Sequence, residues 1–358
     1  MNPTAVALSK RGHAVDFVRM EDHSAYKQLD QPQGIAFVDI DVPPRRTRLS
    51  TFWQQYSFLR QFSAYLERYT PDIVHTNFAV PGIIARYLAA SHGAKVVTTH
   101  HELYGSMNAH YRLGTRLTQA RADALIYVSN VVAKSFPAGP RNESHSKHYV
   151  IHNGIDVEAV TRLRSQNNPA RNAGELLCVG RMVPEKGQSL LVRALAGLHD
   201  AYPALKVRFI GSGPDEGRLK HEARDLGVED NIDFEGWKPR DSVLKAMQSC
   251  TAFVIPSDGT QEGFGLVAAE ALACGAPVLA SNIPVFQEVL GEVGMNCAFE
   301  PGSVGSLVNA IRSLLENLPD RIKNAEELSD RAINAFSAET MTEQYLKVYR
   351  DVLDDREL

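Results

Sequence analysis

The stretch at residues 252–281 constrains the fold more than any other part of the sequence. A short apolar run at 252–255 is followed by loop-forming residues, and strong helix formers then extend over 266–274. Gly275 is typical of a helix end, and a second short apolar run begins at residue 278. This order predicts strand, loop, helix and strand, which is the repeating pattern of an α/β protein.

The loop of this unit has the composition of an anion site. Gly263 and Gly265 stand where the helix begins, and small residues there leave backbone N–H groups open to a ligand. The helix dipole also favours negative charge at that end. Glu262 and Glu270 flank the loop, and carboxylates accept hydrogen bonds from hydroxyl groups rather than binding phosphate. An anion site beside two such acceptors predicts a pocket for a nucleotide sugar.

Strands and helices alternate along nearly the whole chain, on both sides of a polar stretch at residues 161–174. At 358 residues the chain is long for a single core. We therefore predict an α/β protein with two doubly wound domains. An N-terminal domain is expected over residues 1–164 and a C-terminal domain over 165–335. A final helix at 336–358 is expected to pack back on the N-terminal domain.

Two basic residues and a pair of histidines extend the candidate site. Arg181 and Lys186 flank a strand-to-helix loop, and two cations near a helix start suit a pyrophosphate. His100 and His101 follow a predicted strand at 95–99. The carboxyl end of a parallel strand faces the crevice where ligands bind in open α/β sheets. A structural role for the two histidines is the alternative.

Two other motifs are interpreted as structural. Asp39-Ile-Asp41 has the spacing of a metal-binding pair of aspartates, but it stands at a predicted strand end directly before two prolines. We therefore predict no metal site there. Gly211 and Gly213 repeat the pattern of a strand followed by glycine, and this lone G-x-G is interpreted as a turn.

Composition limits the compartment and the partners. No apolar run approaches the roughly 20 residues of a membrane span, and no signal peptide is recognised. The four cysteines form no C-x-x-C pair, so we predict free thiols and a cytoplasmic protein. Residues 1–150 carry 17 Lys and Arg against 11 Asp and Glu, a net charge of +6 that leaves −10 for the remainder. This suggests an anionic partner, such as a membrane surface or a phosphate-bearing acceptor, with scattered solvated charge as the alternative.

Residues 50–69 predict an amphipathic helix rich in aromatic side chains. Arg45, Arg46 and Arg48 precede its aromatic residues. A helix of this composition could rest on lipid head groups, which would place the protein at the inner face of the membrane. Packing of the same helix on a sheet is the alternative.

Together these patterns resemble glycosyltransferase family 4, whose members are retaining enzymes of the GT-B fold. The most specific element is Glu262-x7-Glu270 within EGFGLVAAEALACGAPVLAS. The resemblance extends over nearly the whole chain through Gly180-Arg181, Glu185-Lys186-Gly187, Asn153-Gly-Ile-Asp156, Val128-Ser129 and Thr99-x-His101-Glu102. It implies two Rossmann-like doubly wound domains that face a central cleft.

The resemblance also implies roles for residues at matching positions. Arg181 and Lys186 would bind the donor pyrophosphate. Glu262 would bind hydroxyls of the donor sugar, and Glu270 the ribose. His101 would contact the sugar near the reacting carbon, with His100 as the fallback. Further implied donor-binding residues are Gly180, Gly263, Phe264, Gly265 and Leu266. No covalent nucleophile, cofactor or metal is implied, because transfer in this family is described as same-face attack assisted by a donor phosphate oxygen.

The implied activity is transfer of a hexosyl group from a UDP- or GDP-sugar to a glycan or lipid-linked acceptor. Synthesis of a cell-surface polysaccharide or lipopolysaccharide is the expected setting, and nucleic acid is not an expected partner. Family members normally begin with a strand and a glycine-rich loop ahead of the helix that starts here near Asn2. We therefore expect the first strand to be missing, and an inactive nucleotide-sugar-binding or scaffolding homologue is the alternative. A Rossmann dehydrogenase would need a G-x-G-x-x-G motif after a strand, and none is found.

Overall fold

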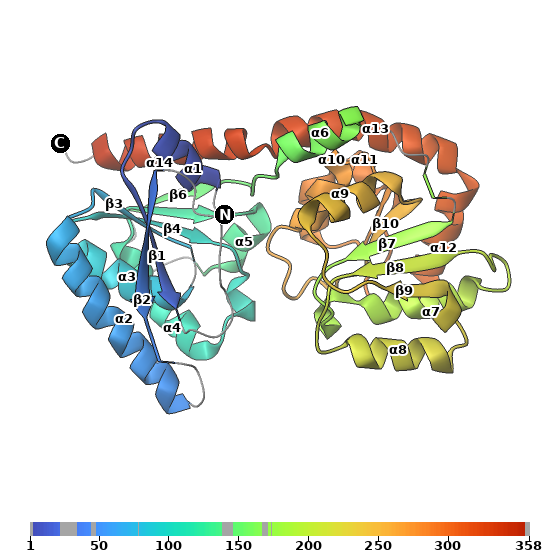
Figure 1. Ribbon diagram of the computed structural model, residues 1–358, viewed down its shortest axis with the longest axis horizontal. Coiled ribbons are helices and arrows are strands. Elements are labelled where there is room, and N and C mark those ends of the chain that lie inside the picture. Colours follow the sequence, from blue (N-terminus) through green and yellow to red (C-terminus); the bar gives the residue numbers. More distant parts are fainter. Residues whose placement is uncertain are drawn as a thin grey trace. The chain divides into compact units, whose positions relative to one another are not determined.

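The computed structural model describes residues 3–21, 34–43, 48–77, 79–137, 146–166, 171–172 and 174–354. The chain forms two compact units (Figure 1). Unit 1 consists of Met1–Gly154 together with Ala338–Leu358, and unit 2 is the intervening segment Ile155–Ser337. Unit 1 is therefore built from two separate parts of the sequence.

The described strands of unit 1 form two parallel sheets. The larger sheet has four strands in the order β3 (Ile73–Thr76), β4 (Lys95–His100), β5 (Ala124–Tyr127) and β6 (Lys147–Val150). The smaller sheet pairs β1 (Val15–Glu21) with β2 (Ile35–Asp41). Two parallel strands need a crossover connection, so along the chain a helix lies between each strand of the larger sheet and the next.

The helices of unit 1 are α1 (Pro3–Lys10), α2 (Arg48–Tyr69), α3 (Ala79–Ser91), α4 (Ala109–Thr118), α5 (Asn130–Ser135) and α14 (Ala338–Asp354). One face of α2 carries Phe58, Phe62 and Leu66, whose spacing of four residues places them together. They share a core with Ile40 of β2 and Ala85 of α3. The face of the predicted helix that carries these three residues is thus buried.

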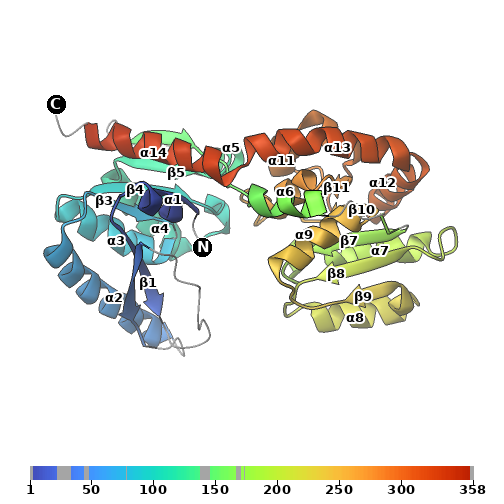
Figure 2. The ribbon, with the colours of Figure 1, turned by 45° about the horizontal axis from the view of Figure 1, so that its top comes forward.

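α14 belongs to unit 1 although it lies at the other end of the chain. Tyr345, Val348 and Val352 are three or four residues apart and are buried in one cluster with Val97 of β4 and Ile126 of β5. Both figures show α14 running beside this sheet (Figure 2). The larger sheet therefore depends on a helix that comes almost 200 residues after its last strand.

A polar network joins α14 to the same sheet. His75 Nδ1 lies 2.5 Å from the hydroxyl of Tyr349, and His75 Nε2 lies 2.8 Å from Thr99 Oγ1. The hydroxyl of Tyr345 lies 3.1 Å from the same Thr99 oxygen. Burial lowers the pKa of His75 to about 3, so its ring is neutral and can donate at one nitrogen and accept at the other.

Unit 2 contains one parallel sheet in the order β11-β10-β7-β8-β9. The strands are β7 (Glu175–Val179), β8 (Lys206–Ile210), β9 (Ile232–Phe234), β10 (Ala252–Ile255) and β11 (Val278–Ala280). The chain runs outward from β7 to β9 and then returns to start again at β10, on the other side of β7. The boundary between β7 and β10 is therefore the topological switch point, where ligands bind in open α/β sheets.

Helices cover both faces of this sheet. They are α6 (Val157–Gln166), α7 (Gln188–Leu198), α8 (Glu216–Asp225), α9 (Arg240–Ser249), α10 (Leu266–Ala273), α11 (Pro284–Gly294), α12 (Val304–Glu316) and α13 (Leu318–Ala335). One face is buried by α7, α8 and α12 through Leu195, Leu219 and Leu307. The doubly wound arrangement predicted from the alternation of strands and helices is confirmed. No helix in the described parts of the chain has the length and apolar content needed to cross a membrane.

The boundary between the units differs from the predicted one. The prediction placed it between residues 164 and 165, which lies inside α6, whereas the units divide between Gly154 and Ile155. Ala159, Val160 and Leu163 of α6 are buried. These three positions have helical spacing, but the many Arg and Asn residues at 161–174 favour a linker when the sequence is considered alone.

Candidate functional site

The switch point of unit 2 brings together two loops that are distant in the sequence. β7 and β10 are neighbouring parallel strands, so the loop after β7 (residues 180–187) and the loop after β10 (residues 256–265) leave the same edge of the sheet. These loops carry Arg181, Lys186 and Glu262. The structure therefore places these three predicted site residues at one edge.

Glycines allow the backbones around these loops to touch. Gly187 has a φ of +70°, and a Cβ atom there would lie 1.9 Å from the carbonyl oxygen of Pro256. Gly211 has a φ of +133°, and a Cβ there would lie 2.0 Å from the carbonyl oxygen of Gly180. The Gly211 turn thus supports the loop that carries Arg181, a role that the sequence motif alone did not indicate.

Hydrogen bonds hold the loop after β10 against Glu185. The Glu185 carbonyl oxygen accepts from Ser257 Oγ at 3.1 Å and from the Asp258 N–H at 3.0 Å. Gln261 Nε2 donates to Glu185 Oε1 at 2.9 Å. Gly180 has its N–H bonded to the Ile210 carbonyl at 3.0 Å, so it contributes to this framework.

Lys186 and Glu262 form an ion pair across the two loops. The Glu262 side chain is only 8% exposed, whereas that of Lys186 is 33% exposed. A buried carboxylate is costly without a partner of opposite charge, and Lys186 supplies that partner for Glu262. The sequence predicted both residues at the site but did not predict that they pair.

Arg181 differs from Lys186 in its surroundings. It is exposed, and within the described chain its guanidinium makes no hydrogen bond or ion pair. Its backbone is nevertheless fixed, because Gln188 Nε2 donates to the Arg181 carbonyl at 3.1 Å. An anchored backbone with an unpaired guanidinium can bind an incoming anion without breaking an internal ion pair.

The start of α10 is formed by glycine, as predicted. Gly265 is the N-cap residue with a φ of +79°, and a Cβ atom there would lie 2.7 Å from the ring of Phe286 on α11. Phe264 is buried, and its ring contacts Phe336 edge-on at 5.6 Å between centroids. The packing of the Phe264 and Phe286 rings anchors the loop. No side chain caps α10, and Leu266 at its first position is partly exposed. The helix start therefore presents backbone N–H groups.

Glu270 lies one turn into α10 and pairs with a residue that the sequence analysis missed. Arg240 Nη2 donates to Glu270 Oε1 at 2.6 Å. Burial raises the pKa of Glu270, Arg240 opposes that rise, and the charge of Asp156 adds to it. Arg240 begins α9, thirty residues away in the chain, and no local motif marks it.

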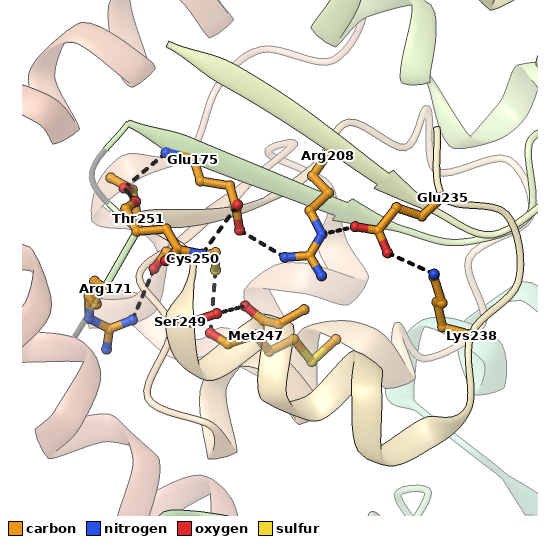
Figure 3. Close-up of polar contacts among 11 residues, drawn as sticks. Arg171, Glu175, Arg208, Glu235, Lys238, Met247, Ser249, Cys250 and Thr251 are labelled. Carbon is orange, nitrogen blue, oxygen red and sulfur yellow. Dashed lines mark hydrogen bonds and ion pairs between the residues drawn. The ribbon is translucent and has the colours of Figure 1, made fainter. Parts of the chain in front are cut away.

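A chain of ion pairs fixes the segment just before Arg240 (Figure 3). Arg208 of β8 pairs with Glu175, at 3.1 Å, and with Glu235, and Lys238 Nζ lies 3.3 Å from Glu235 Oε2. Burial opposes protonation of Arg208, but the two carboxylates raise its pKa above the ordinary value. Trp237 stands in the same segment and is 75% exposed.

The two predicted histidines lie in unit 1 and differ from each other. His100 is 5% exposed, its ring lies 4.2 Å from that of Phe136, and its Nε2 has no hydrogen-bond partner among the described residues. His101 is partly buried, and its Nε2 lies 3.3 Å from Asn77 Oδ1. Burial lowers the pKa of His101, which favours the neutral ring. Of the pair, His101 is the one that a ligand could reach.

Asp39 of the aspartate pair in β2 contacts the neighbouring strand β1. Asp39 accepts a hydrogen bond from Arg19 Nη2 of β1 at 2.9 Å. The described part of the chain contains no group of three or more His, Cys, Asp or Glu side chains placed to hold a metal ion.

Comparison with known proteins identifies the family. The model "Glycosyltransferase Family 4" matches residues 4–159, and the model "Glycosyl transferases group 1" matches residues 160–334. The chain belongs to glycosyltransferase family 4. It is an enzyme of the hexosyltransferase type, as the resemblance of the Glu262-x7-Glu270 stretch predicted.

Relatives with curated names are similar over most of the chain. D-inositol 3-phosphate glycosyltransferase of Corynebacterium glutamicum is 25% identical, over 98% of this chain and 90% of the relative. Glycogen synthase of Mycobacterium tuberculosis is 29% identical, over 78% of this chain and 68% of the relative.

Solved structures show the same fold. Sucrose-phosphate synthase from Thermosynechococcus elongatus has a TM-score of 0.83 at 22% identity, covering 98% of this chain and 92% of that structure. Anabaena HepE in complex with UDP-glucose has a TM-score of 0.72 at 21% identity, covering 89% and 86%. The fold of this glycosyltransferase is thus GT-B, as predicted.

Proposed function

We propose that the protein transfers a hexosyl group from a nucleoside-diphosphate sugar to an acceptor hydroxyl with retention at the anomeric carbon. The bond between that carbon and the diphosphate breaks, and the acceptor oxygen bonds to the carbon on the same face. The acceptor proton passes to the departing phosphate oxygen. The protein then contributes position and charge rather than a covalent nucleophile.

The arrangement of charges at the edge of β7 and β10 carries this proposal. Arg181 provides an unpaired cation, and the Lys186–Glu262 pair lies on the adjacent loops. The N-terminus of α10 begins beside Glu262. A site with cations and a helix N-terminus on one side and a carboxylate on the other suits a diphosphate joined to a polyol.

Each predicted donor-site residue has a proposed role. Arg181 and Lys186 neutralise the diphosphate as charge develops on it. The backbone at Gly263, Gly265 and Leu266 approaches the phosphates. Glu262 accepts hydrogen bonds from sugar hydroxyls. Glu270 accepts them from the ribose, with Arg240 holding its carboxylate in place. Phe264 and Gly180 act through their packing. His101 is proposed, from the resemblance, to contact the sugar.

A UDP-sugar is the proposed donor. Solved structures of the same fold contain UDP with glucose, UDP alone and UDP-glucose in Anabaena HepE. GDP-sugars are the second donor class to be compared. No resident cofactor or metal is part of the proposal, because Arg181 and Lys186 supply the positive charge that the diphosphate requires.

An anionic glycan or a lipid-linked glycan is the proposed acceptor, in the synthesis of a cell-surface polysaccharide or lipopolysaccharide. Residues 1–150 have a net charge of +6, which favours an acceptor that bears phosphate or carboxylate. Relatives named for D-inositol 3-phosphate and for phosphatidyl-myo-inositol support a phosphate-bearing acceptor.

Calorimetric titration with UDP and GDP tests the donor site. We expect UDP to bind, and Arg181→Ala to weaken its binding by about 10- to 100-fold, because a charge-assisted bidentate contact is lost. Arg162→Ala removes an exposed arginine of unit 2 that pairs with Asp241 and should leave UDP binding unchanged. Tighter binding of GDP than of UDP would make a GDP-sugar the proposed donor. Equal UDP affinity in Arg181→Ala and the wild type would overturn the assignment of the site. UDP binding without turnover of any UDP-sugar would favour an inactive homologue.

A further inference from the structure

Arg86 of α3 is a buried cation in unit 1 without a carboxylate partner. The residue is 1% exposed, and its guanidinium bonds Thr118 Oγ1 twice, through Nε at 3.1 Å and through Nη2 at 3.0 Å. A guanidinium carries five N–H donors, so three of them have no acceptor within the described part of the chain. Burial lowers the pKa of Arg86 to about 10, which leaves the group charged at pH 7. The described side chains therefore provide no opposite charge for it.

The two ends of the Arg86 guanidinium face opposite helix poles. Thr118 is the last residue of α4, so the Nε and Nη2 donors lie at a helix C-terminus, which carries partial negative charge. Nη1 instead lies beside the first turn of α3, because a Cβ atom on Gly82 would be 3.5 Å from it. The start of a helix carries partial positive charge, and the first turn of α3 contains no acidic residue. Two positive groups therefore meet at Nη1.

The absence of a side chain at Gly82 leaves space between Nη1 and the end of β3. A Cβ atom on Gly82 would also lie 3.4 Å from Thr76 Cβ and 3.6 Å from Thr76 Oγ1. Thr76 ends β3, and the next residue, Asn77, has its Oδ1 3.3 Å from His101 Nε2. Asn77 and His101 are both partly exposed. The space beside Arg86 therefore lies at the carboxyl edge of β3 and β4, the edge of this sheet that reaches solvent.

The buried histidine at the end of β4 adds a second unsatisfied group. His100 is 5% exposed, and its Nε2 has no partner among the described residues. Besides burial, the groups whose charges lower its pKa are Arg86, His101 and His148, and none of them is acidic. This part of unit 1 therefore combines positive charge with donors that lack acceptors. An oxyanion, which offers only acceptors and negative charge, is its chemical complement.

We propose that the carboxyl edge of β3 and β4 binds an oxyanion, a phosphate or carboxylate group, held by Arg86 Nη1 and the backbone N–H groups that begin α3. Water could satisfy these donors but not the charge. The site belongs to unit 1, whereas the donor-site residues Arg181, Lys186 and Glu262 belong to unit 2. The oxyanion is either free phosphate or a group on the acceptor. Only the acceptor source rests on the proposed function.

Calorimetric titration of the whole protein with inorganic phosphate, at constant ionic strength and without a donor, tests the site. Phosphate can also bind at the donor site, so the titration is made in Arg181→Ala as well. We expect a binding event to remain in Arg181→Ala and to weaken at least about tenfold when Arg86→Met is added. Arg86→Met should not lower the melting temperature, because replacing a buried unpaired charge by an apolar group is usually neutral or stabilising.

Gly82→Ala is the sharper variant, because it fills the space beside Nη1 and leaves Arg86 in place. The new methyl group would make ordinary van der Waals contacts, and alanine favours a helix, so the fold should be retained. Phosphate affinity should fall at least about tenfold in the Arg181→Ala background. Gly197→Ala in α7 of unit 2 is the matched control, since a Cβ there would meet only Val308, at 3.4 Å. It should leave phosphate binding unchanged.

A comparison of ligands separates the two sources. Tighter binding of glycerol 3-phosphate than of inorganic phosphate, with no binding of glycerol, would assign the site to a phosphate group carried by an acceptor. Tighter binding of inorganic phosphate would assign it to the free ion. Absence of phosphate binding in Arg181→Ala, or binding that Arg86→Met and Gly82→Ala both leave unchanged, would overturn the proposal. UDP titration of Gly82→Ala reports on the donor site separately, so failure of one site is distinguished from failure of the other.

Discussion

Glu262 is a carboxylate with 8% of its side chain exposed, and Lys186 places the opposite charge beside it. The pair lies between loops that follow two different strands. A donor diphosphate near Lys186 would therefore compete with Glu262 for the same ammonium group. The Glu262 carboxylate and the Lys186 ammonium group balance each other's charge within the fold, which lowers the free-energy cost of burying the carboxylate.

Lys186→Ala should reduce donor affinity and also lower the free energy of unfolding by about 1–3 kcal/mol, because Glu262 is left buried and unpaired. The double variant Lys186→Ala and Glu262→Gln removes that unpaired charge. It should recover at least half of the lost stability and none of the transfer activity. Urea unfolding and initial-rate assays of the single and double variants check this expectation.

Lys220→Ala is the matched control, because Lys220 forms an exposed ion pair with Glu216 on α8. It should change the free energy of unfolding by less than about 0.5 kcal/mol. Stabilities of Lys186→Ala and Glu262→Gln that simply add in the double variant would show that the two side chains do not act as a pair.

The role of an individual residue was predictable where a single short segment contains both the residue and the feature that explains its role. Gly265 follows from the helix start, and Glu262 from its place before that start. Arg240 was not predictable, because its partner Glu270 lies thirty residues away and only the fold brings them together. The same holds for Phe286, whose ring excludes any side chain at Gly265.

At the scale of elements, the segment from Glu235 to Arg240 connects strand β8 of the sheet to Glu270 in the candidate site. Its first residue is held by Arg208 and its last by Glu270. Both ends of the segment are therefore fixed by charge, while Trp237 between them remains exposed. Movement at Glu235 would be passed to Arg240, and through it to Glu270.

Arg208→Met keeps an unbranched apolar stem and removes the charged guanidinium group. We expect the free energy of unfolding to fall by about 1–3 kcal/mol, because Glu175 and Glu235 lose their shared partner. KM for the donor should rise by a larger factor than kcat falls, because the proposed contact of Glu270 with the ribose would be displaced while the residues proposed to contact the reacting centre stay in place. Denaturant titration and donor-dependent kinetics provide both values.

Arg218→Met gives the comparison on α8, where a half-exposed arginine pairs with Asp215 and Glu222. It should cost between about 0 and 1 kcal/mol and leave KM unchanged. If Arg208→Met also left KM unchanged, the segment before Arg240 would not be what positions Glu270.

Elements with strong periodicity were predictable, whereas α5, α6 and α11 were not. The strands of both units follow from short apolar runs, and α10 follows from helix formers between Gly265 and Gly275. α6 was assigned to a linker because polar residues surround its three buried positions. α11 was not predicted, and Gly291 within it has a φ of +67°, which interrupts the helical pattern. Helix propensity predicts a helix poorly where only a few residues form its buried face.

At the scale of the whole molecule, acid should affect unit 1 through His100. Burial first, and then the charge of Arg86, lowers the pKa of His100 to about 3, against about 6.5 in an unfolded chain. The unfolded state therefore binds more protons below pH 6.5. His100 contributes its full stabilisation above that pH, and the contribution is lost as pH falls towards 3, by up to about 1.4 kcal/mol per unit.

Urea unfolding at pH 7 and pH 5 measures this effect. The wild type should lose about 2 kcal/mol more between these values than His100→Gln does. His13→Gln removes an exposed histidine of unit 1 and should keep the pH dependence of the wild type. The same loss in His100→Gln and the wild type would assign the acid sensitivity to other groups.

The order of unit 2 inside unit 1 has a consequence for synthesis on the ribosome. Unit 2 is complete once Ser337 has been added, whereas unit 1 still lacks α14 at that moment. Until then Val97, Ala124 and Ile126 lack the side chains of α14 that pack with them in one buried cluster. The nascent chain can therefore complete unit 2 before unit 1 is complete. A chaperone that shields exposed strands would act longest on the segment of unit 1 that precedes unit 2 in the sequence.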